Sequence, residues 1–130
     1  MYTSTTQNVT VSVLPRYLDH ESAPEKNVYV WAYTVRIENN GEYTVQLRTR
    51  HWKITDAYGR VQEVHGPGVV GEQPVLKPGE TFEYTSGTPL TTSSGIMQGS
   101  YSMQREDGNM FDVDIPVFSL DSAGTPKRVN

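Results

Sequence analysis

Three glycines near the middle of the chain have the spacing with which many proteins hold a phosphate group. Gly66, Gly68 and Gly71 form the pattern G-x-G-x-x-G. In dinucleotide-binding folds this pattern follows a buried strand and opens a helix, whose free N–H groups and positive dipole end bind the pyrophosphate. The three glycines are therefore a candidate site for a nucleotide or for pyrophosphate.

The residues that follow argue against a helix after this motif. Pro74, Pro78 and Gly79 come close behind the third glycine, and each of these residue types interrupts a helix. Pro67, inside the motif, has no N–H group to donate to a phosphate. A loop that turns sharply between two sheets requires glycines for steric reasons alone. We expect a structural turn within a loop over residues 66–79, and keep a phosphate-binding nest of backbone N–H groups as the alternative.

A short basic segment lies upstream of the glycines and contains Arg48, Arg50, His51 and Lys53. Arg48, Arg50 or His51 would supply positive charge to a phosphorylated ligand at the glycine loop. Alternation along a strand places Arg48 and Arg50 on one face and separates the others, so an ordinary solvated surface is the simpler interpretation. The formal net charge of −4 argues against a nucleic-acid partner, which needs lysines and arginines clustered on one face.

Metal-ligating side chains occur in the same part of the sequence, at His51, Asp56, Glu63 and His65. Cobalt or zinc would be held by imidazoles and carboxylates that converge, and magnesium by oxygen ligands and retained waters. None of these residues forms a pair with diagnostic spacing. His65 is the best single candidate, but a lone histidine beside a turn is more often simply hydrogen-bonded. We therefore expect no cofactor.

No recognisable catalytic set is present. The serines and threonines are many, but none lies in a motif such as G-x-S-x-G. Asp112 and Asp114 share one face of an expected strand, where like charges on a solvated surface are the plainer explanation. We predict that the protein is not an enzyme.

The elements that must position these residues are β-strands, because apolar and polar residues alternate with a period of two and turn residues separate the alternating segments. The expected strands lie at about residues 9–13, 28–38, 45–54, 61–64, 80–86, 97–103 and 111–115. About seven short strands without a helix predict an all-β fold, an antiparallel β-sandwich of the immunoglobulin or fibronectin type III kind. A closed barrel is the alternative.

Local irregularities are also expected along these strands. The buried positions change from odd numbers at Leu47 to even numbers at Trp52, which predicts a β-bulge between Arg48 and His51. Gly99 marks a bulge or a close backbone contact.

Two prolines and one polar segment set expected boundaries. Pro15 is expected to end the first strand, and Pro116 to restrict the last one to an edge or an ending. The polar segment 87–95 is expected to be an exposed loop because it is dense in threonine and serine.

The size and composition of the chain predict a single domain over residues 1–130, with a core at about 6–120 and a polar, frayed tail at 121–130. There is no cysteine, no signal-peptide pattern at the start and no apolar run of the roughly 20 residues that span a bilayer. We expect a cytoplasmic protein without membrane insertion.

Aromatic side chains indicate protein binding. The chain has eight tyrosines and two tryptophans, more than the core alone must take, and aromatic residues are favoured at interfaces. Tyr43, Tyr58 and the loop 66–73 are the expected contact surface. A homodimer that pairs through a free sheet edge is a further expectation that the sequence leaves open.

Several segments together carry a resemblance to one protein family. They are residues 32–39 (AYTVRIEN), 45–47 (VQL), 51–54 (HWKI), 68–74 (GVVGEQP), 78–80 (PGE), 84–87 (YTSG), 95–103 (GIMQGSYSM) and 111–118 (FDVDIPVF). With these segments, the chain resembles the bacterial ApaG family, also called CorD, over about residues 6–120.

The resemblance implies a fibronectin-type β-sandwich. Members of the ApaG family are linked by genetics to cobalt resistance and magnesium efflux, and related domains are fused to F-box proteins in eukaryotes, which implies partner binding. We therefore expect a non-enzymatic protein-interaction module with an unidentified protein partner, indirectly linked to cobalt resistance and magnesium efflux. The alternative function is binding of a phosphorylated small molecule, a nucleotide or pyrophosphate, at the loop 66–71.

Overall fold

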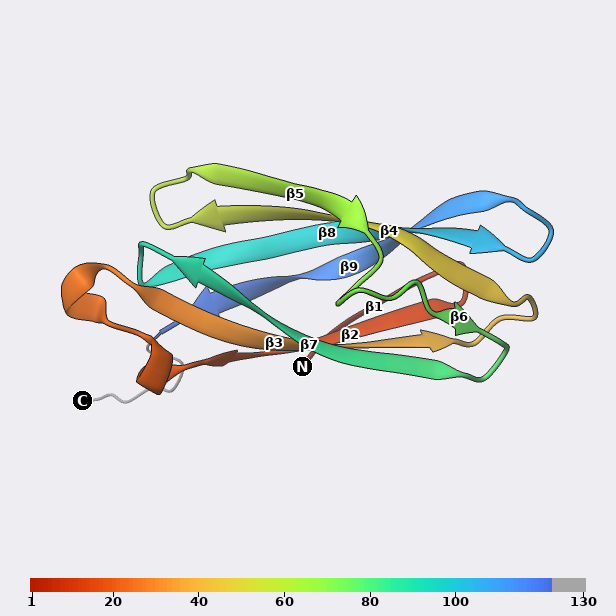
Figure 1. Cartoon of the computed structure of the whole chain (residues 1–130), viewed down its shortest axis with the longest axis horizontal. Coiled ribbons are helices and arrows are strands. Elements are labelled where there is room, and N and C mark those ends of the chain that lie inside the picture. The colour runs from red at the N-terminus through yellow and green to blue at the C-terminus, as the bar shows by residue number, and fades with distance from the viewer. Residues whose placement is uncertain (123–130) are drawn as a thin grey trace.

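The computed structural model describes residues 1–122 and shows two antiparallel sheets packed face to face (Figure 1). One sheet has the order β1 (Tyr2–Thr6), β2 (Val9–Tyr17), β3 (Tyr29–Asn39) and β7 (Thr81–Leu90). The other has the order β5 (Val61–Pro67), β4 (Val45–Asp56), β8 (Ser94–Arg105) and β9 (Met110–Asp121), and β6 (Val75–Leu76) also pairs with β4. The predicted fibronectin-like β-sandwich is confirmed.

All seven expected strand segments are present, and β1 and β6 are additional. The described residues contain no α-helix, only the single-turn 3₁₀-helices η1 (Asp19–Glu21) and η2 (Pro24–Lys26) between β2 and β3. Of the predicted tail, Asp121 ends β9, and residues 123–130 lie outside the described part of the chain.

The core lies between the sheets, where alternate residues of each strand meet. Trp31, Tyr33 and Trp52 are among its largest side chains, and the Tyr33 and Trp52 rings meet edge to face with centroids 5.3 Å apart. Phe118 from β9 packs against both of these rings, with centroids 6.0 Å from each. The aromatic side chains Trp31 and Tyr33 of β3 are therefore buried in the core.

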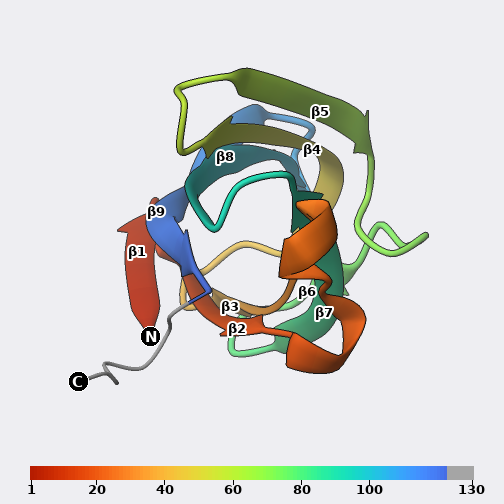
Figure 2. The ribbon, with the colours of Figure 1, turned by 90° about the vertical axis from the view of Figure 1, so that its left-hand side faces the viewer.

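The two long sides of the sandwich differ. On one side β1 lies beside β9, where the Ser4 hydroxyl donates to the Asp114 carbonyl at 2.9 Å and the Asp114 N–H donates to the Thr6 hydroxyl at 3.2 Å. The other side, which we call the open side, has the free edges of β5 and β7, and Figure 2 shows the loop after β5 projecting there away from the body of the protein.

Two expected boundaries are wrong. β2 continues through Pro15 to Tyr17, because β1 pairs with β2 only as far as Val13 and Pro15 faces no ladder on that side. The expected loop 87–95 belongs mostly to β7 and β8. Thr88 lies in β7 opposite Trp31 and is buried, while Thr91 and Thr92 lie in the short connection between the two strands.

The β-bulge predicted in the third expected strand is present in β4, close to its predicted position. Arg48 is the extra residue of a bulge in β4, one position before the expected interval, because Leu47 pairs with Met103 and Thr49 pairs with Ser102. After this bulge the even-numbered residues of β4, from residue 50 onward, face the interior.

Gly99 combines the two roles expected of it. The register between β8 and β9 shifts between Met97 and Gly99, and a Cβ at Gly99 would overlap the carbonyl oxygen of His51. Opposite this shift, the chain carries Pro116 in β9, which is an edge strand, as expected.

A candidate interaction surface and metal-ligating cluster

The glycine motif forms a turn, not a helix. β5 extends through Gly66 to Pro67, and the chain then makes a two-residue hairpin in which Val69 and Glu72 exchange N–H···O bonds of 2.8 and 2.9 Å. The two residues between them, Val70 and Gly71, have φ values of +43° and +82°. Two successive positive φ angles are typical of a type I′ turn.

Two of the three glycines lie in close contacts, and the contact at Gly68 is with backbone. Gly68 has a φ of +63°, and a Cβ there would overlap the carbonyl oxygen of Glu72. A Cβ at Gly66 would lie 2.9 Å from Nη1 of Arg50. The N–H groups of Gly68 and Val69 already donate, to the carbonyls of Arg48 and Glu72 respectively. These amides are therefore not free to bind a phosphate.

The basic residues named with the glycine loop take different positions. Arg50 faces the loop, and its Nη1 donates to the carbonyl oxygens of Pro67 and Gly68 at 3.0 and 2.9 Å. Arg48 donates to side-chain oxygens of Gln104 and Gln73. His51 lies on the opposite face of the sheet, so of these three side chains Arg50 is the one that donates hydrogen bonds to residues 66–71.

A pocket of about 210 Å³ lies beneath the hairpin, on the open side. It is lined by Tyr33, Arg50, Trp52, Val69, Val70, Gly71, Tyr84 and Ser86. Behind it the hydroxyls of Tyr84 and Tyr101 share a hydrogen bond of 2.5 Å. Burial raises the pKa of both Tyr84 and Tyr101 well above the ordinary value of 10.0, so both stay neutral.

Val70 stands at the tip of the hairpin with 54% of its surface exposed. Its neighbour Val69 is only 1% exposed and packs into the core. A positive φ is a genuine outlier for a β-branched residue, because the branched Cβ crowds the backbone. The hairpin therefore anchors one valine and holds the next one outward in a strained conformation.

A second pocket, of about 390 Å³, lies farther along the open side. β4 and β7 line both pockets, and Val28, Ile54, Val61, Pro89 and Leu90 are the apolar residues of this one. Val61, in the edge strand β5, is 51% exposed. Apolar surface is therefore available along the open side as well as at the hairpin tip.

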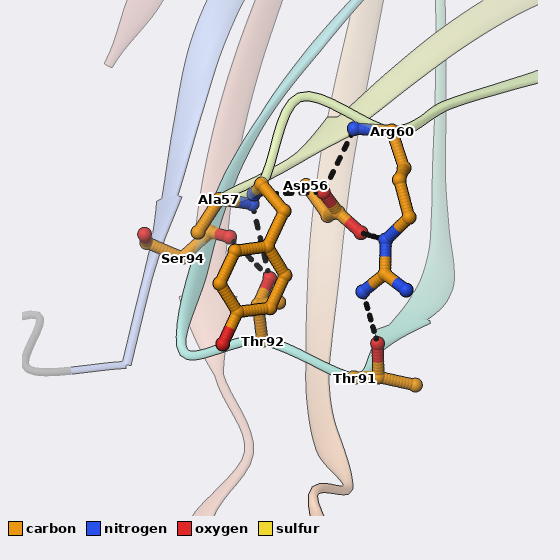
Figure 3. Close-up of polar contacts among 7 residues, drawn as sticks. Asp56, Ala57, Arg60, Thr91, Thr92 and Ser94 are labelled. Atoms are coloured by element: carbon orange, nitrogen blue, oxygen red, sulfur yellow. Dashed lines mark hydrogen bonds and ion pairs between the residues drawn. The ribbon is translucent and has the colours of Figure 1, made fainter.

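Asp56, one of the candidate metal ligands, fixes the turn beside the second pocket (Figure 3). Its carboxylate accepts the backbone N–H groups of Tyr58 and Arg60 at 2.9 and 3.0 Å, and Nε of Arg60 at 2.7 Å. Partial burial raises the pKa of this carboxyl, but the donors of Arg60 and Tyr58 outweigh that effect and hold the pKa below its ordinary value.

The same turn is tied to the connection between β7 and β8, as Figure 3 shows. Nη2 of Arg60 donates to the Thr91 hydroxyl at 3.3 Å, and the Ala57 N–H donates to the Thr92 hydroxyl at 3.2 Å. The Thr92 hydroxyl in turn donates to the Ser94 carbonyl at 2.8 Å. One end of the open side is therefore held by polar contacts between the two sheets.

The expected contact residues do not all meet. Tyr58 is 79% exposed and follows β4, at the end of the open side. Tyr43 precedes β4 at the opposite end of that strand, where the Arg105 guanidinium lies over its ring at 3.9 Å. The hairpin and Tyr58 belong to the open side, and Tyr43 lies elsewhere.

His51, Glu63 and His65 come together on the outer face of β4 and β5. His51 and His65 are paired across the two strands, and their rings stack with centroids 4.1 Å apart and planes at 8°. Oε1 of Glu63 lies 2.7 Å from Nε2 of His51 and 4.0 Å from Nε2 of His65. The hydrogen bond from His51 is the main reason that the pKa of Glu63 is lowered.

Sequence spacing did not reveal this cluster as a set. Glu63 and His65 are two residues apart, which puts them on one face of a strand. Their relation to His51 depends on the register between β4 and β5, which pairs His51 with His65. The i, i+2 spacing was the one available signal.

In the described part of the chain, no helix has the length and apolar character needed to cross a membrane.

Comparison with known proteins assigns the chain to a family. The sequence profile of the ApaG domain matches residues 19–105. A Protein ApaG from Paramagnetospirillum magneticum and one from Rhodospirillum centenum are each 63% identical over 130 residues, which are 100% of both chains. A crystal structure of an ApaA protein from Bordetella pertussis matches with a TM-score of 0.87 and 55% identity, over 90% of this chain and 95% of that chain. On these matches, the chain belongs to the ApaG family.

Proposed function

We propose that this member of the ApaG family is a non-enzymatic protein-interaction module of the cytoplasm. It influences divalent-cation homeostasis, including cobalt resistance and magnesium efflux, only indirectly, through a protein partner. The observation that carries the proposal is Val70, an exposed apolar residue with a φ of +43° at the hairpin tip. The family resemblance supports the connection to cations.

The strain at Val70 supports a binding role. A residue forced into a sparsely populated backbone region costs roughly 1–3 kcal/mol, and it persists only where its surroundings impose it. Here the paired hydrogen bonds of Val69 and Glu72, and the close fit of Gly68 against Glu72, impose it. Such strain collects at ligand-binding positions, and Val70 offers a partner an apolar side chain that is already fixed in place.

The surroundings of the hairpin fit an extended segment of a partner protein. The free edges of β5 and β7 expose backbone groups with which an added strand can pair. The two pockets on the open side, about 210 and 390 Å³, would take side chains of that strand. We propose a partner that pairs with one of these edges and packs an apolar side chain against Val70.

Capture from a bacterial lysate with three forms of the protein tests this function. The bait forms are the wild type, Val70→Asn and Val117→Asn, because Val117 is equally exposed, at 56%, but lies on β9 at the other side of the sandwich. We expect a partner that the wild type and Val117→Asn retain and that Val70→Asn loses at least tenfold. Equal recovery by all three forms, or no partner above background, would overturn the proposal.

Light scattering on the purified protein checks whether the partner is a second copy. A homodimer paired through β5 or β7 would have a measured mass twice that of the chain. The Val70→Asn variant would then have the mass of a monomer. A monomer at all concentrations assigns the open side to a different protein.

A phosphorylated small molecule is the second candidate ligand, and Arg50 is the observation that favours it. The Arg50 side chain lines the 210 Å³ pocket, and its Nη1 donates to the carbonyls of the loop. Its other nitrogens have no hydrogen bond to the described residues. Titration of pyrophosphate into labelled protein should then shift the Arg50 side-chain signals, and Arg50→Gln should abolish the shift. Unmoved signals at millimolar pyrophosphate exclude this ligand.

A further inference from the structure

We propose that His51, Glu63 and His65 form a binding site for one divalent transition-metal ion, of which Zn²⁺ is the representative. The site lies on the outer face of the sheet formed by β4 and β5, whereas the proposed partner surface lies on the open side. Glu63 and His65 belong to β5, whose edge borders the open side, but the inference does not depend on a partner, because metal binding uses outward-facing side chains and not the backbone groups of that edge. It extends the sequence expectation, which named His65 as the best single candidate ligand.

The three ligand atoms are close enough to share one ion. One ligating atom of each residue lies within 4.8 Å of the others. Zinc bonds of about 2.0–2.2 Å in tetrahedral geometry place ligand atoms roughly 3.3 Å apart. The distances of Glu63 Oε1 from the two Nε2 atoms, 2.7 and 4.0 Å, lie on either side of that value. To bind one ion, the two histidine rings must turn out of their parallel stack so that both Nε2 lone pairs point at it, and rotation of the Glu63 side chain completes the set.

The two strands hold the ligands in position while leaving the metal position accessible. His51 and His65 are opposite each other in an antiparallel ladder, so their Cα positions are fixed by backbone hydrogen bonds. Their side chains are 37% and 71% exposed, and that of Glu63 is 54% exposed. Exposed side chains can rotate toward an ion at little cost, and water can complete its coordination.

The donor set selects the class of metal. Two imidazole nitrogens and one carboxylate oxygen suit borderline ions such as Zn²⁺, Co²⁺ and Ni²⁺. Mg²⁺ demands oxygen ligands in near-octahedral geometry, and Ca²⁺ takes six to eight oxygens, so neither fits a site with two histidines. We therefore expect Zn²⁺ to bind and Mg²⁺ not to bind.

Lys53 is the positive charge that opposes the ion. It is paired directly with Glu63 across β4 and β5, and its ammonium acts on that carboxylate. Removing the charge in Lys53→Gln should tighten Zn²⁺ binding about two- to fivefold, as expected for a single exposed charge. A structural role of the cluster alone would give no such change.

The decisive experiment titrates ZnCl₂ into the untagged, chelator-washed protein and follows binding heat together with histidine ring signals. We expect one ion per chain and shifts of the His51 and His65 rings. His20, the remaining histidine of the chain, lies in η1 and serves as the internal control. His20→Ala should bind as the wild type does.

Two variants separate ligation from structure. Glu63→Gln keeps the shape of the side chain and should weaken Zn²⁺ binding about tenfold or more, and His65→Ala should abolish it. Circular dichroism and thermal unfolding without metal check that both variants are folded. The proposal is overturned if millimolar Zn²⁺ moves neither ring, if folded His65→Ala binds as tightly as the wild type, or if binding follows His20.

Discussion

Among single residues, Val70 and Asp56 are the most informative, because one is strained and the other has all of its local hydrogen bonds satisfied. Val70 is exposed and strained, held at a positive φ by the hairpin that contains it. Asp56 is satisfied by three hydrogen bonds within its own turn. The first is the position that we propose to contact a partner, and its strain lowers stability. The second has a structural role in its turn, where the sequence offered a candidate metal ligand.

Val70→Asn should stabilise the protein by about 1 kcal/mol, because Asn followed by Gly71 is a preferred pair in a type I′ turn and the valine strain is released. Urea unfolding measures the change, with Val117→Asn as the control that gains nothing. Loss of partner binding together with a gain in stability would separate function from folding at this position. A clear loss of stability would contradict the strain assigned to Val70.

Asp56→Asn should lower the unfolding midpoint at neutral pH, and the difference should disappear in acid. The pKa of this carboxyl is lower in the folded protein, so its contribution is present above the unfolded value of about 3.9 and is lost as the pH falls through the folded value. Thermal unfolding at neutral pH and below about pH 3 measures it. Asp112→Asn, at an exposed position of β9, is the surface control that removes a carboxylate outside this turn.

At the scale of elements, the close approach of β4 and β8 depends on Gly99. A Cβ there would overlap the His51 carbonyl, so the two strands would have to separate. Gly99→Ala should therefore cost more than about 2 kcal/mol in unfolding free energy, while Ser100→Ala on the same strand stays within about 0.5 kcal/mol. Chemical denaturation measures the free energy of unfolding of both variants. Equal values would contradict the close contact between Gly99 and the His51 carbonyl.

At the scale of the whole molecule, buried hydrogen bonds join the two sheets: the hydroxyls of Tyr84 in β7 and Tyr101 in β8 share one, and the Asn39 side chain of β3 donates another to the Leu76 carbonyl of β6. Tyr84→Phe should lower the free energy of unfolding by about 1–3 kcal/mol, because it leaves the Tyr101 hydroxyl buried without this partner.

Burial raises the pKa values of both Tyr84 and Tyr101 in the folded protein above 10.0. The stability that these groups contribute is therefore complete below the unfolded pKa of about 10 and falls as the pH rises above it. Unfolding curves at neutral pH and about pH 11 test this, and a flat alkaline profile would contradict it.

The alternation of apolar and polar residues was sufficient to predict the fold class and most of the strands, because every second side chain of a half-buried strand is buried. Even the bulge at Arg48 was predictable to within one position, since the shift from Leu47 to Trp52 changes the parity of the buried side chains. The ends of the strands could be predicted less well from the sequence. Pro15 is tolerated because β1 ends its pairing at Val13, which is a property of the neighbouring strand and not of the local sequence.

What the candidate residues can do together depends on contacts that form only when the chain has folded. The register of β4 against β5 brings His51 to His65 and Glu63, and the hairpin geometry turns Val69 inward and Val70 outward although both are valines. In the same hairpin, the N–H groups of Gly68 and Val69 donate to backbone carbonyl oxygens. Contacts between segments distant in sequence depend on pairing and packing, which local periodicity does not encode.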